Sequence, residues 1–220
     1  YVLARVFRPT FLDVFDLTNL ELGTLFSTYG SVAFLSYIFG GVLADKFSPR
    51  KLLAYSLMLT SLGGFFMMSY PSYFTLQLIY AYWGFTTVFL FWAPMIKATS
   101  IIGGLKKQGK TFSFLDAGRG IVASSIGIIG VLIFAFVVVG DISNSTLQEK
   151  RDAFRYVIGA SSLIVFITGI IVYNFLNIEI DSEAKIGDFR DMKKLMKSKS
   201  VILIGLIILT AYMGYKITDI

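Results

Sequence analysis

Gly40-Gly41-Val42-Leu43-Ala44-Asp45-Lys46-Phe47-Ser48-Pro49-Arg50-Lys51 is a short charged segment between two long hydrophobic runs. The runs, 22–44 and 52–68, have about the length that a helix needs to cross a bilayer. Pro49 cannot continue the first helix, and a turn this short leaves the two helices antiparallel and adjacent. The two glycines permit close helix packing, as small residues do inside membranes. The segment therefore predicts a helical hairpin that turns at a membrane surface.

The composition is that of a polytopic membrane protein. Of the 220 residues, 55% are hydrophobic and 15% are charged, and the mean hydropathy is +0.72. Soluble domains rarely carry so many uninterrupted apolar runs, so we predict an all-α membrane helix bundle. The net charge of +6 resides in particular loops, and we therefore expect the lipid bilayer, and no nucleic acid, as a partner.

The residue types argue against several kinds of chemistry. The chain contains no cysteine and no histidine, so we expect no disulfide, no transition-metal site and no cofactor. It has no glycine-rich phosphate loop ending in lysine and serine or threonine, so ATP is not expected to drive it. Nothing in the sequence has the pattern of a nucleophile with its base, so we do not expect an enzyme.

We predict three parts along the chain. Residues 1–176 form an N-terminal bundle of six spans with the first one truncated, 177–200 form a cytoplasmic amphipathic linker, and 201–220 begin a C-terminal half with the seventh span. The first six spans are expected at about 1–12, 22–44, 52–69, 73–96, 111–139 and 156–176. Thr18 and Glu21 have the spacing of a capping box before the second span. Because the chain starts at Tyr1 rather than methionine and ends without a cap, we expect a fragment of a longer protein.

Lysine and arginine residues mark one side of the predicted bundle. Segments 45–51, 97–110 and 177–200 carry most of them, whereas the opposite side holds Lys150, Arg151 and Arg155. By the positive-inside rule the three basic segments are cytoplasmic. We therefore expect an integral, multi-pass protein of the inner membrane with its basic loops in the cytoplasm.

The pattern Gly41-x-Leu43-Ala44-Asp45-Lys46-x-Ser48-x-Arg50-Lys51 resembles the signature loop between the second and third spans of the major facilitator superfamily. Ser48 stands where that signature usually has glycine, and Pro49 where it often has a cation. The resemblance implies a secondary transporter that works by rocker-switch alternating access. It also implies that Gly41, Asp45, Arg50 and Lys51 form a gating latch and not the substrate site.

Charged residues inside predicted spans are costly, and each is therefore a candidate for function. They are Arg5, Arg8, Lys97, Asp116, Arg119, Lys216 and Asp219. Arg5 and Arg119 would make a positive cavity, and guanidinium groups suit oxyanions. Two structural alternatives stay open. Arg8 would snorkel to the headgroups, and Asp116 and Arg119, three residues apart on a helix, would neutralise one another.

Further segments resemble the branch of that superfamily that exchanges organophosphates for inorganic phosphate. They are Tyr1-Val2-Leu3-Ala4-Arg5, the Ser48-Pro49-Arg50 variant of the latch, Trp92-Ala93-Pro94, and Gln108-Gly109 followed by Ser113. In that branch a first-span arginine binds phosphate and falls on Arg5, while a fifth-span histidine falls on Arg119. A second-span lysine falls on Tyr37, and a seventh-span arginine falls two residues before Lys216. The resemblance thus implies a substrate site of Arg5, Arg119, Tyr37 and Lys216.

We predict a monomeric carrier, antiporter or symporter, for a small organic anion such as an organophosphate. H⁺, Na⁺ or phosphate would be the coupling ion, with Asp116 as the candidate for proton coupling. Two rivals are a transporter-like anion sensor and a drug or neutral-solute antiporter in which the arginines are structural. Tyr29, Tyr37 and Trp83 would either line a cavity or pack in the core.

Overall fold

The structure, a computed structural model, describes residues 2–104, 106–137, 145–178 and 197–218. The side chains of residues 2, 38, 208, 209 and 211–218 are not described. The chain divides into two compact units, Tyr1–Ile180 and Asp181–Ile220. The described part of the second unit contains the helix α10 (Lys199–Thr218).

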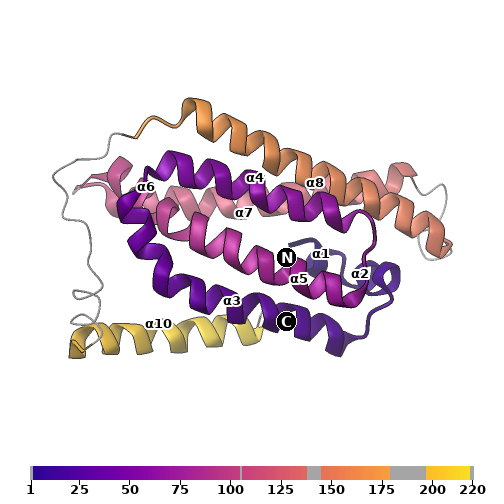
Figure 1. Cartoon of the computed structure of the whole chain (residues 1–220), viewed down its shortest axis with the longest axis horizontal. Helices are drawn as coiled ribbons and strands as arrows, with labels where there is room; N and C mark the ends of the chain where they lie inside the picture. The colour runs from indigo at the N-terminus through magenta and orange to yellow at the C-terminus, as the bar shows by residue number, and fades with distance from the viewer. Residues whose placement is uncertain (1, 105, 138–144, 179–196, 219–220) are drawn as a thin grey trace. The chain divides into compact units, whose positions relative to one another are not determined.

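Helices make up the first unit (Figure 1). Its described elements are α1 (Val2–Val6), α2 (Arg8–Phe15), α3 (Asn19–Lys46), α4 (Pro49–Met67), α5 (Tyr73–Gly84), the π-helix η1 (Phe85–Trp92), α6 (Ala93–Gly103), α7 (Gln108–Val137) and α8 (Leu147–Phe175). All regular elements in the described residues are therefore helical, which confirms the predicted all-α class. The predicted linker falls mostly on 179–196, outside the described residues.

The first span is broken at Phe7. This residue has φ −112° and ψ 38°, between α1 and α2. Pro9 lies in the first turn of α2, and it cannot donate the helical hydrogen bond to the Arg5 carbonyl. A missing bond of this kind is a common cause of a bend in a helix. The span continues to Phe15, three residues beyond the predicted end near residue 12.

Two long helices begin with a capping box. At α3, the Thr18 hydroxyl accepts from the Glu21 N–H at 3.2 Å and the Glu21 carboxylate accepts from the Thr18 N–H at 2.8 Å, which confirms the prediction. Thr146 and Glu149 repeat this arrangement at α8. The second box starts α8 at Leu147, so this helix begins before the predicted sixth span near residue 156. The side-chain bonds satisfy N–H groups that a helix start leaves without partners.

The fourth span is one helical stretch, Tyr73–Gly103, that contains η1 in its middle. Pro94 follows η1 and has no N–H to donate to the carbonyl four residues earlier. A π-helix accommodates a helix segment in which one backbone hydrogen bond is missing. Hydroxyl groups from α4 support it: Ser56 donates to the Thr86 carbonyl at 2.8 Å and Thr60 donates to the Thr86 hydroxyl at 3.0 Å. The predicted loop at 97–110 was therefore too long, because α6 extends to Gly103.

The interior of the first unit is aromatic at the end where α2 stops and α8 begins, which we call the distal end. Phe11 and Phe154 are fully buried there, and their rings meet edge to face with centroids 6.0 Å apart. The ring of Phe7 stacks on that of Phe134, which joins α7 to this core. Elsewhere α4 packs along α8, and α3 packs along α5 and η1.

Tyr70 ties the α4–α5 turn to α8 at the distal end. Its hydroxyl donates to the Arg151 carbonyl, and the guanidinium groups of Arg151 and Arg155 lie 5.8 and 5.4 Å from its ring centroid. Burial raises the pKa of Tyr70 to about 12, although the two guanidinium groups act in the opposite direction. The neutral phenol is thus the form that the fold favours.

This pKa predicts a loss of stability at high pH. A tyrosine with a pKa of 10.0 when unfolded and about 12 when folded stabilises the fold fully below pH 10. The contribution disappears as the pH rises from 10 to 12, because folding then requires the phenol to keep its proton. We expect the melting temperature of the wild type to fall more steeply across this range than that of Tyr70→Phe, which keeps the ring. Equal slopes for the two proteins would contradict the assignment.

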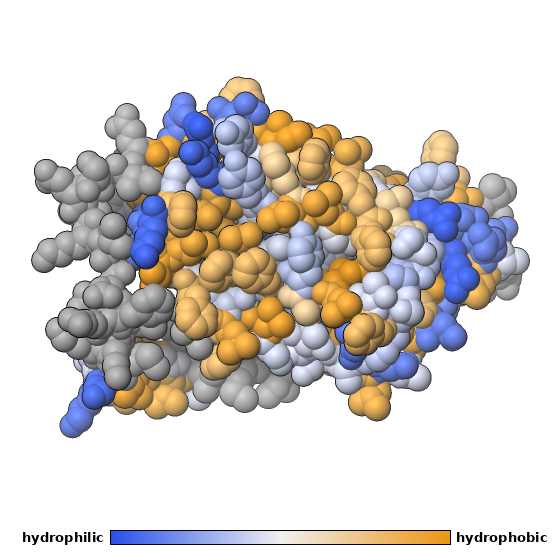
Figure 2. Space-filling model, viewed as in Figure 1, coloured by the Kyte–Doolittle hydropathy of each residue, from blue (hydrophilic) through white to orange (hydrophobic). Residues whose placement is uncertain are grey.

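Three described helical stretches are long and apolar enough to cross a membrane: Tyr73–Gly103, Gln108–Val137 and Leu147–Phe175. Residues Asn19–Tyr37 and Phe39–Lys46 of α3 make a fourth if these two parts, bent by 53°, count as one span. On the face shown in Figure 2, hydrophobic residues cover the middle and hydrophilic residues gather toward the ends. This distribution is the one expected for helices that cross a bilayer.

Candidate functional site

Arg119 on α7 lies between a carboxylate and an aromatic ring. Its Nη1 is 3.1 Å from Asp116 Oδ1, and its guanidinium carbon lies 4.9 Å from the centroid of the Trp92 ring. The side chains of Arg119 and Asp116 are 53% and 73% exposed within the structure. The alternative in which Asp116 and Arg119 pair is therefore what the structure contains. The guanidinium has a contact on two sides, and about half of the Arg119 side chain remains accessible.

Arg5 occupies the last turn of α1 and is exposed. The neighbouring Val6 faces α7, where a side chain at Gly127 would meet it at 3.7 Å. Residue 119 lies eight positions before Gly127, which corresponds to about 12 Å along the axis of α7. The two arginines thus lie on neighbouring helices, and the contact of Val6 on α7 lies about 12 Å along the axis from residue 119.

The other two residues that the resemblance assigns to the substrate site lie on α3 and α10. Tyr37 on α3 has a side chain that is 53% exposed, and it does not belong to the residues that line the described cavities. Lys216 lies on α10, in the second unit, and its side chain is outside the described ones. Arg8 donates to the Asn19 side chain at 3.0 Å at the start of α3.

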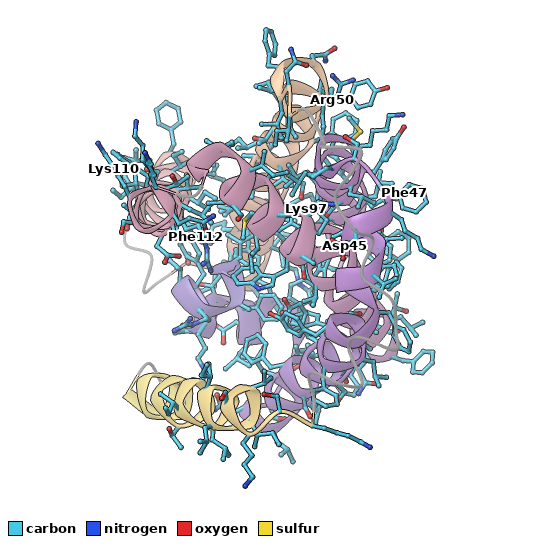
Figure 3. All side chains as sticks on the ribbon, turned by 90° about the vertical axis from the view of Figure 1, so that its left-hand side faces the viewer. Asp45, Phe47, Arg50, Lys97, Lys110 and Phe112 are labelled. Carbon is cyan, nitrogen blue, oxygen red and sulfur yellow. The ribbon has the colours of Figure 1, made fainter. Side chains whose placement is uncertain are left out.

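A different set of charges surrounds the latch at the opposite end of the unit, which we call the basic end. Asp45, Arg50, Lys97 and Lys110 all lie at this end in Figure 3. Lys97 reaches from α6 to the end of α3, where its Nζ donates to the Ala44 carbonyl at 2.9 Å and lies 3.6 Å from Asp45 Oδ1. The last carbonyl groups of a helix lack partners within it and attract cations. We call this set of contacts the α3–α6 tie.

Arg50 makes a separate connection at the basic end. It donates to the Asn177 side chain at 3.1 Å, and its guanidinium lies 5.5 Å from the Tyr173 ring centroid. The start of α4 is thereby joined to the end of α8. Lys51 is exposed, and Gly41 has open space around its Cα. Among the latch residues, Asp45 and Arg50 therefore have different partners in this structure.

Gly40, which precedes the latch, explains how α3 approaches its neighbour. A Cβ at Gly40 would lie 3.3 Å from the Phe89 carbonyl oxygen, so the backbones of α3 and η1 nearly touch there. Gly40 thus allows α3 to pack closely against the fourth span. The second and third spans, which we predicted to be adjacent, pack mainly against the fourth span and against α8 instead.

A cavity of about 270 Å³ lies inside the first unit, between helices of both the α3–α5 and α4–α8 pairs. Tyr29 and Trp83 belong to its lining. The alternative in which Tyr29 and Trp83 border a cavity is therefore confirmed.

Sequence reasoning missed the ring of Trp92 beside Arg119 and the role of Lys97. The spacing of Asp116 and Arg119 is a local signal on one helix. No local rule states which residue of another helix will reach them. For Lys97, the signal was its position at the end of a span opposite a helix C-terminus.

These features define an α-helical membrane protein with a charged hinge and a half-exposed arginine in its fifth span. The Major Facilitator Superfamily model matches residues 2–218, so the chain belongs to this family of membrane transporters. It is 29% identical over 160 residues to inner membrane protein YqcE of Escherichia coli, a match that covers 73% of this chain and 36% of that protein. It is 27% identical over 210 residues to inner membrane protein YihN of the same organism, with coverage of 92% and 48%.

The chain thus spans about half, or less, of the length of these relatives. No solved structure matches it. The family, the names of the relatives and the apolar helices together place it among multi-pass proteins of the inner membrane.

Proposed function

We propose that the chain belongs to a secondary transporter that moves a small organic anion by rocker-switch alternating access. The observation that carries this proposal is Arg119, a permanent cation held by Asp116 and Trp92 with half of its side chain accessible. A cation in this position on a membrane-spanning helix is costly unless it serves a ligand or a partner.

Asp116 is the carboxylate that an incoming anion would replace at Arg119. An incoming oxyanion would compete with the Asp116 carboxylate for the guanidinium, while the Trp92 ring keeps the guanidinium in place. When an anion occupies the guanidinium, the Asp116 carboxylate is left without its cation. Asp116 is accordingly our candidate for coupling anion binding to a proton, with Na⁺ or phosphate as the other coupling ions to be tested.

The other residues that the sequence singled out have proposed roles in substrate contact or in gating. Arg5 would contact the anion from the first span, with Tyr37 and Lys216 as further substrate contacts. Gly41, Asp45, Arg50 and Lys51 would act as the latch that stabilises closure of the basic end. Organophosphate or phosphate is the substrate class that the resemblance of Arg5 and its neighbours supports.

The test is anion-dependent thermal stabilisation of the purified full-length protein. A ligand that binds only the folded state raises the melting temperature. The probes are inorganic phosphate, glucose 6-phosphate, citrate and uncharged glucose. We expect at least one anion to stabilise the wild type, and Arg119→Gln to weaken its binding about 10-fold, since hydrogen bonds to charged groups contribute about 1.5–3 kcal/mol.

Arg155→Gln is the matched control. Arg155 also has an aspartate three residues away, Asp152 at 3.8 Å, and also lies over an aromatic ring, but at the distal end. Its replacement should leave anion binding unchanged. Equal losses in both variants, or anion binding without uptake into proteoliposomes, would contradict the proposed transporter.

A further inference from the structure

The cavity of about 270 Å³ has a lining without charge. It lies among α1, α2, α3, α4, α5, η1, α7 and α8, and none of the described residues that line it is ionised at neutral pH. Its polar lining consists of hydroxyl groups and one indole, from Tyr29, Thr60, Ser61, Tyr80, Trp83, Thr87, Ser161 and Ser162. The rest of the lining is apolar or aromatic. The volume lies just below the range typical of sites for drug-sized ligands.

Most of the protons on these polar groups already have acceptors in the protein. Ser61 donates to the Met58 carbonyl at 2.6 Å, and Ser162 donates to the Ile158 carbonyl at 2.8 Å. The Trp83 indole N–H donates to the Thr60 carbonyl at 2.9 Å. A hydroxyl has one proton and two lone pairs, so each serine oxygen keeps the capacity to accept.

The pair formed by Tyr29 and Thr87 leads to the same conclusion. Thr87 donates its single proton to the Trp83 carbonyl at 2.5 Å. The 3.0 Å contact between the Tyr29 and Thr87 hydroxyls must then use the proton of Tyr29. Thr60 likewise uses its proton on the Thr86 hydroxyl at 3.0 Å. The hydroxyl groups of Tyr29, Thr60, Ser61, Thr87 and Ser162 therefore offer lone pairs to a guest.

Two glycine residues leave the space that the Ser162 hydroxyl and the Trp83 ring occupy at the cavity wall. A Cβ at Gly64 would lie 2.1 Å from the Ser162 hydroxyl, and a Cβ at Gly63 would lie 2.6 Å from the Trp83 indole nitrogen. Any larger residue at either position would displace a group that lines the cavity. The two glycines on α4 thus seat one hydroxyl and one aromatic ring at the cavity wall.

We propose that this cavity binds an uncharged polyhydroxylated molecule of about the size of a monosaccharide or smaller. An anion carries only acceptors and would face the lone pairs of these five hydroxyl groups. A cation would lose its hydration without a carboxylate in the lining. A polyol supplies O–H donors for the acceptors, and its C–H surface suits the rings of Tyr29 and Trp83. The site is separate from Arg119 and does not depend on the proposed anion.

The experiment measures binding of glycerol, erythritol, xylitol and D-glucose to the purified full-length protein by calorimetry. We expect at least one of the four to bind with 1:1 stoichiometry. Ser161→Leu, which fills the cavity from α8, should weaken that binding at least 10-fold. Thr60→Val removes an acceptor without a change in size and should also weaken it, so the test does not depend on one variant folding.

Two controls separate the cavity from other sites. Thr168→Leu changes an exposed hydroxyl residue on the same helix and should leave polyol binding unchanged, as should Arg119→Gln. Xylonate, which carries a carboxylate on the skeleton of xylitol, should not compete with the bound polyol. The proposal is overturned if none of the four polyols binds, if Ser161→Leu binds as the wild type does, or if xylonate competes as well as xylitol.

Discussion

Replacement of Gly84 by leucine is expected to prevent the first unit from folding. Gly84 lies at the junction of α5 and η1 with φ −57° and ψ −38°, a helical conformation that any residue can adopt. Glycine is needed there for space alone. A Cβ would lie 2.6 Å from the Tyr29 carbonyl oxygen and 3.2 Å from the Ala33 nitrogen, and both are backbone atoms within α3.

The backbone of a helix cannot move aside as a side chain can. Overpacking of this kind typically costs about 1–3 kcal/mol and occasionally more. We expect Gly84→Ala to lower the melting temperature clearly and Gly84→Leu to yield no monodisperse protein on size-exclusion chromatography. Alanine favours helices over glycine by about 1 kcal/mol, so the observed loss for Gly84→Ala will understate the clash.

Gly30→Ala is the matched control. Gly30 is on α3, next to Tyr29, and a Cβ there would meet nothing within 4 Å in the described structure. The same substitution should therefore leave the melting temperature unchanged or raise it. If Gly84→Ala proved as stable as Gly30→Ala, the close approach of α3 to the fourth span would be wrong.

Local signals were sufficient to predict much of the fold. The hinge at 45–51, the apolar runs beside it and the capping box at Thr18 depend on residues close together in the sequence, and the structure contains each of them. The box at Thr146 has the same pattern and was readable by the same rule. The π-helix was not predicted. It depends on Pro94 in a helix that hydroxyl groups of a neighbouring helix support.

The candidate site likewise contains one feature that local sequence spacing predicts and others that depend on how the helices pack. The Asp116–Arg119 pair follows from a spacing of three residues on one helix. The Trp92 ring beside Arg119 depends on how α7 packs against the fourth span, and sequence spacing contains no such information. The contact of Val6 with α7 at Gly127, about 12 Å along the axis from residue 119, likewise follows from the register of α1 on α7, which a single sequence does not specify.

Disruption of the α3–α6 tie is expected to have the second large effect, a loss of transport rate. Lys97 Nζ interacts with the Ala44 carbonyl at 2.9 Å, the Asp45 carbonyl at 3.4 Å and the Asp45 carboxylate at 3.6 Å. Its side chain is only 22% exposed, so solvent screens these contacts less than it would at an open surface. One lysine therefore neutralises both the negative end of α3 and the carboxylate of the latch.

Lys97→Glu reverses this charge, and we expect it to lower the transport rate about 100-fold. The variant loses a cation at a helix C-terminus, worth up to about 2 kcal/mol, and adds an anion beside Asp45. The end of α3 would then separate from α6, and closure of the basic end would become unfavourable. The measurement is uptake into proteoliposomes, with the melting temperature recorded to show that the variant is folded.

Comparison variants distinguish the tie from a general effect of charge. Lys107→Glu makes the same change at an exposed lysine in the turn before α7, and it should transport nearly as well as the wild type. Asp45→Lys combined with Lys97→Glu restores opposite charges between the two side chains but leaves an anion facing the carbonyl groups of α3. Recovery in this double variant should therefore be partial. Full recovery would mean that the side-chain ion pair alone matters. No recovery would assign the effect to the helix carbonyl groups.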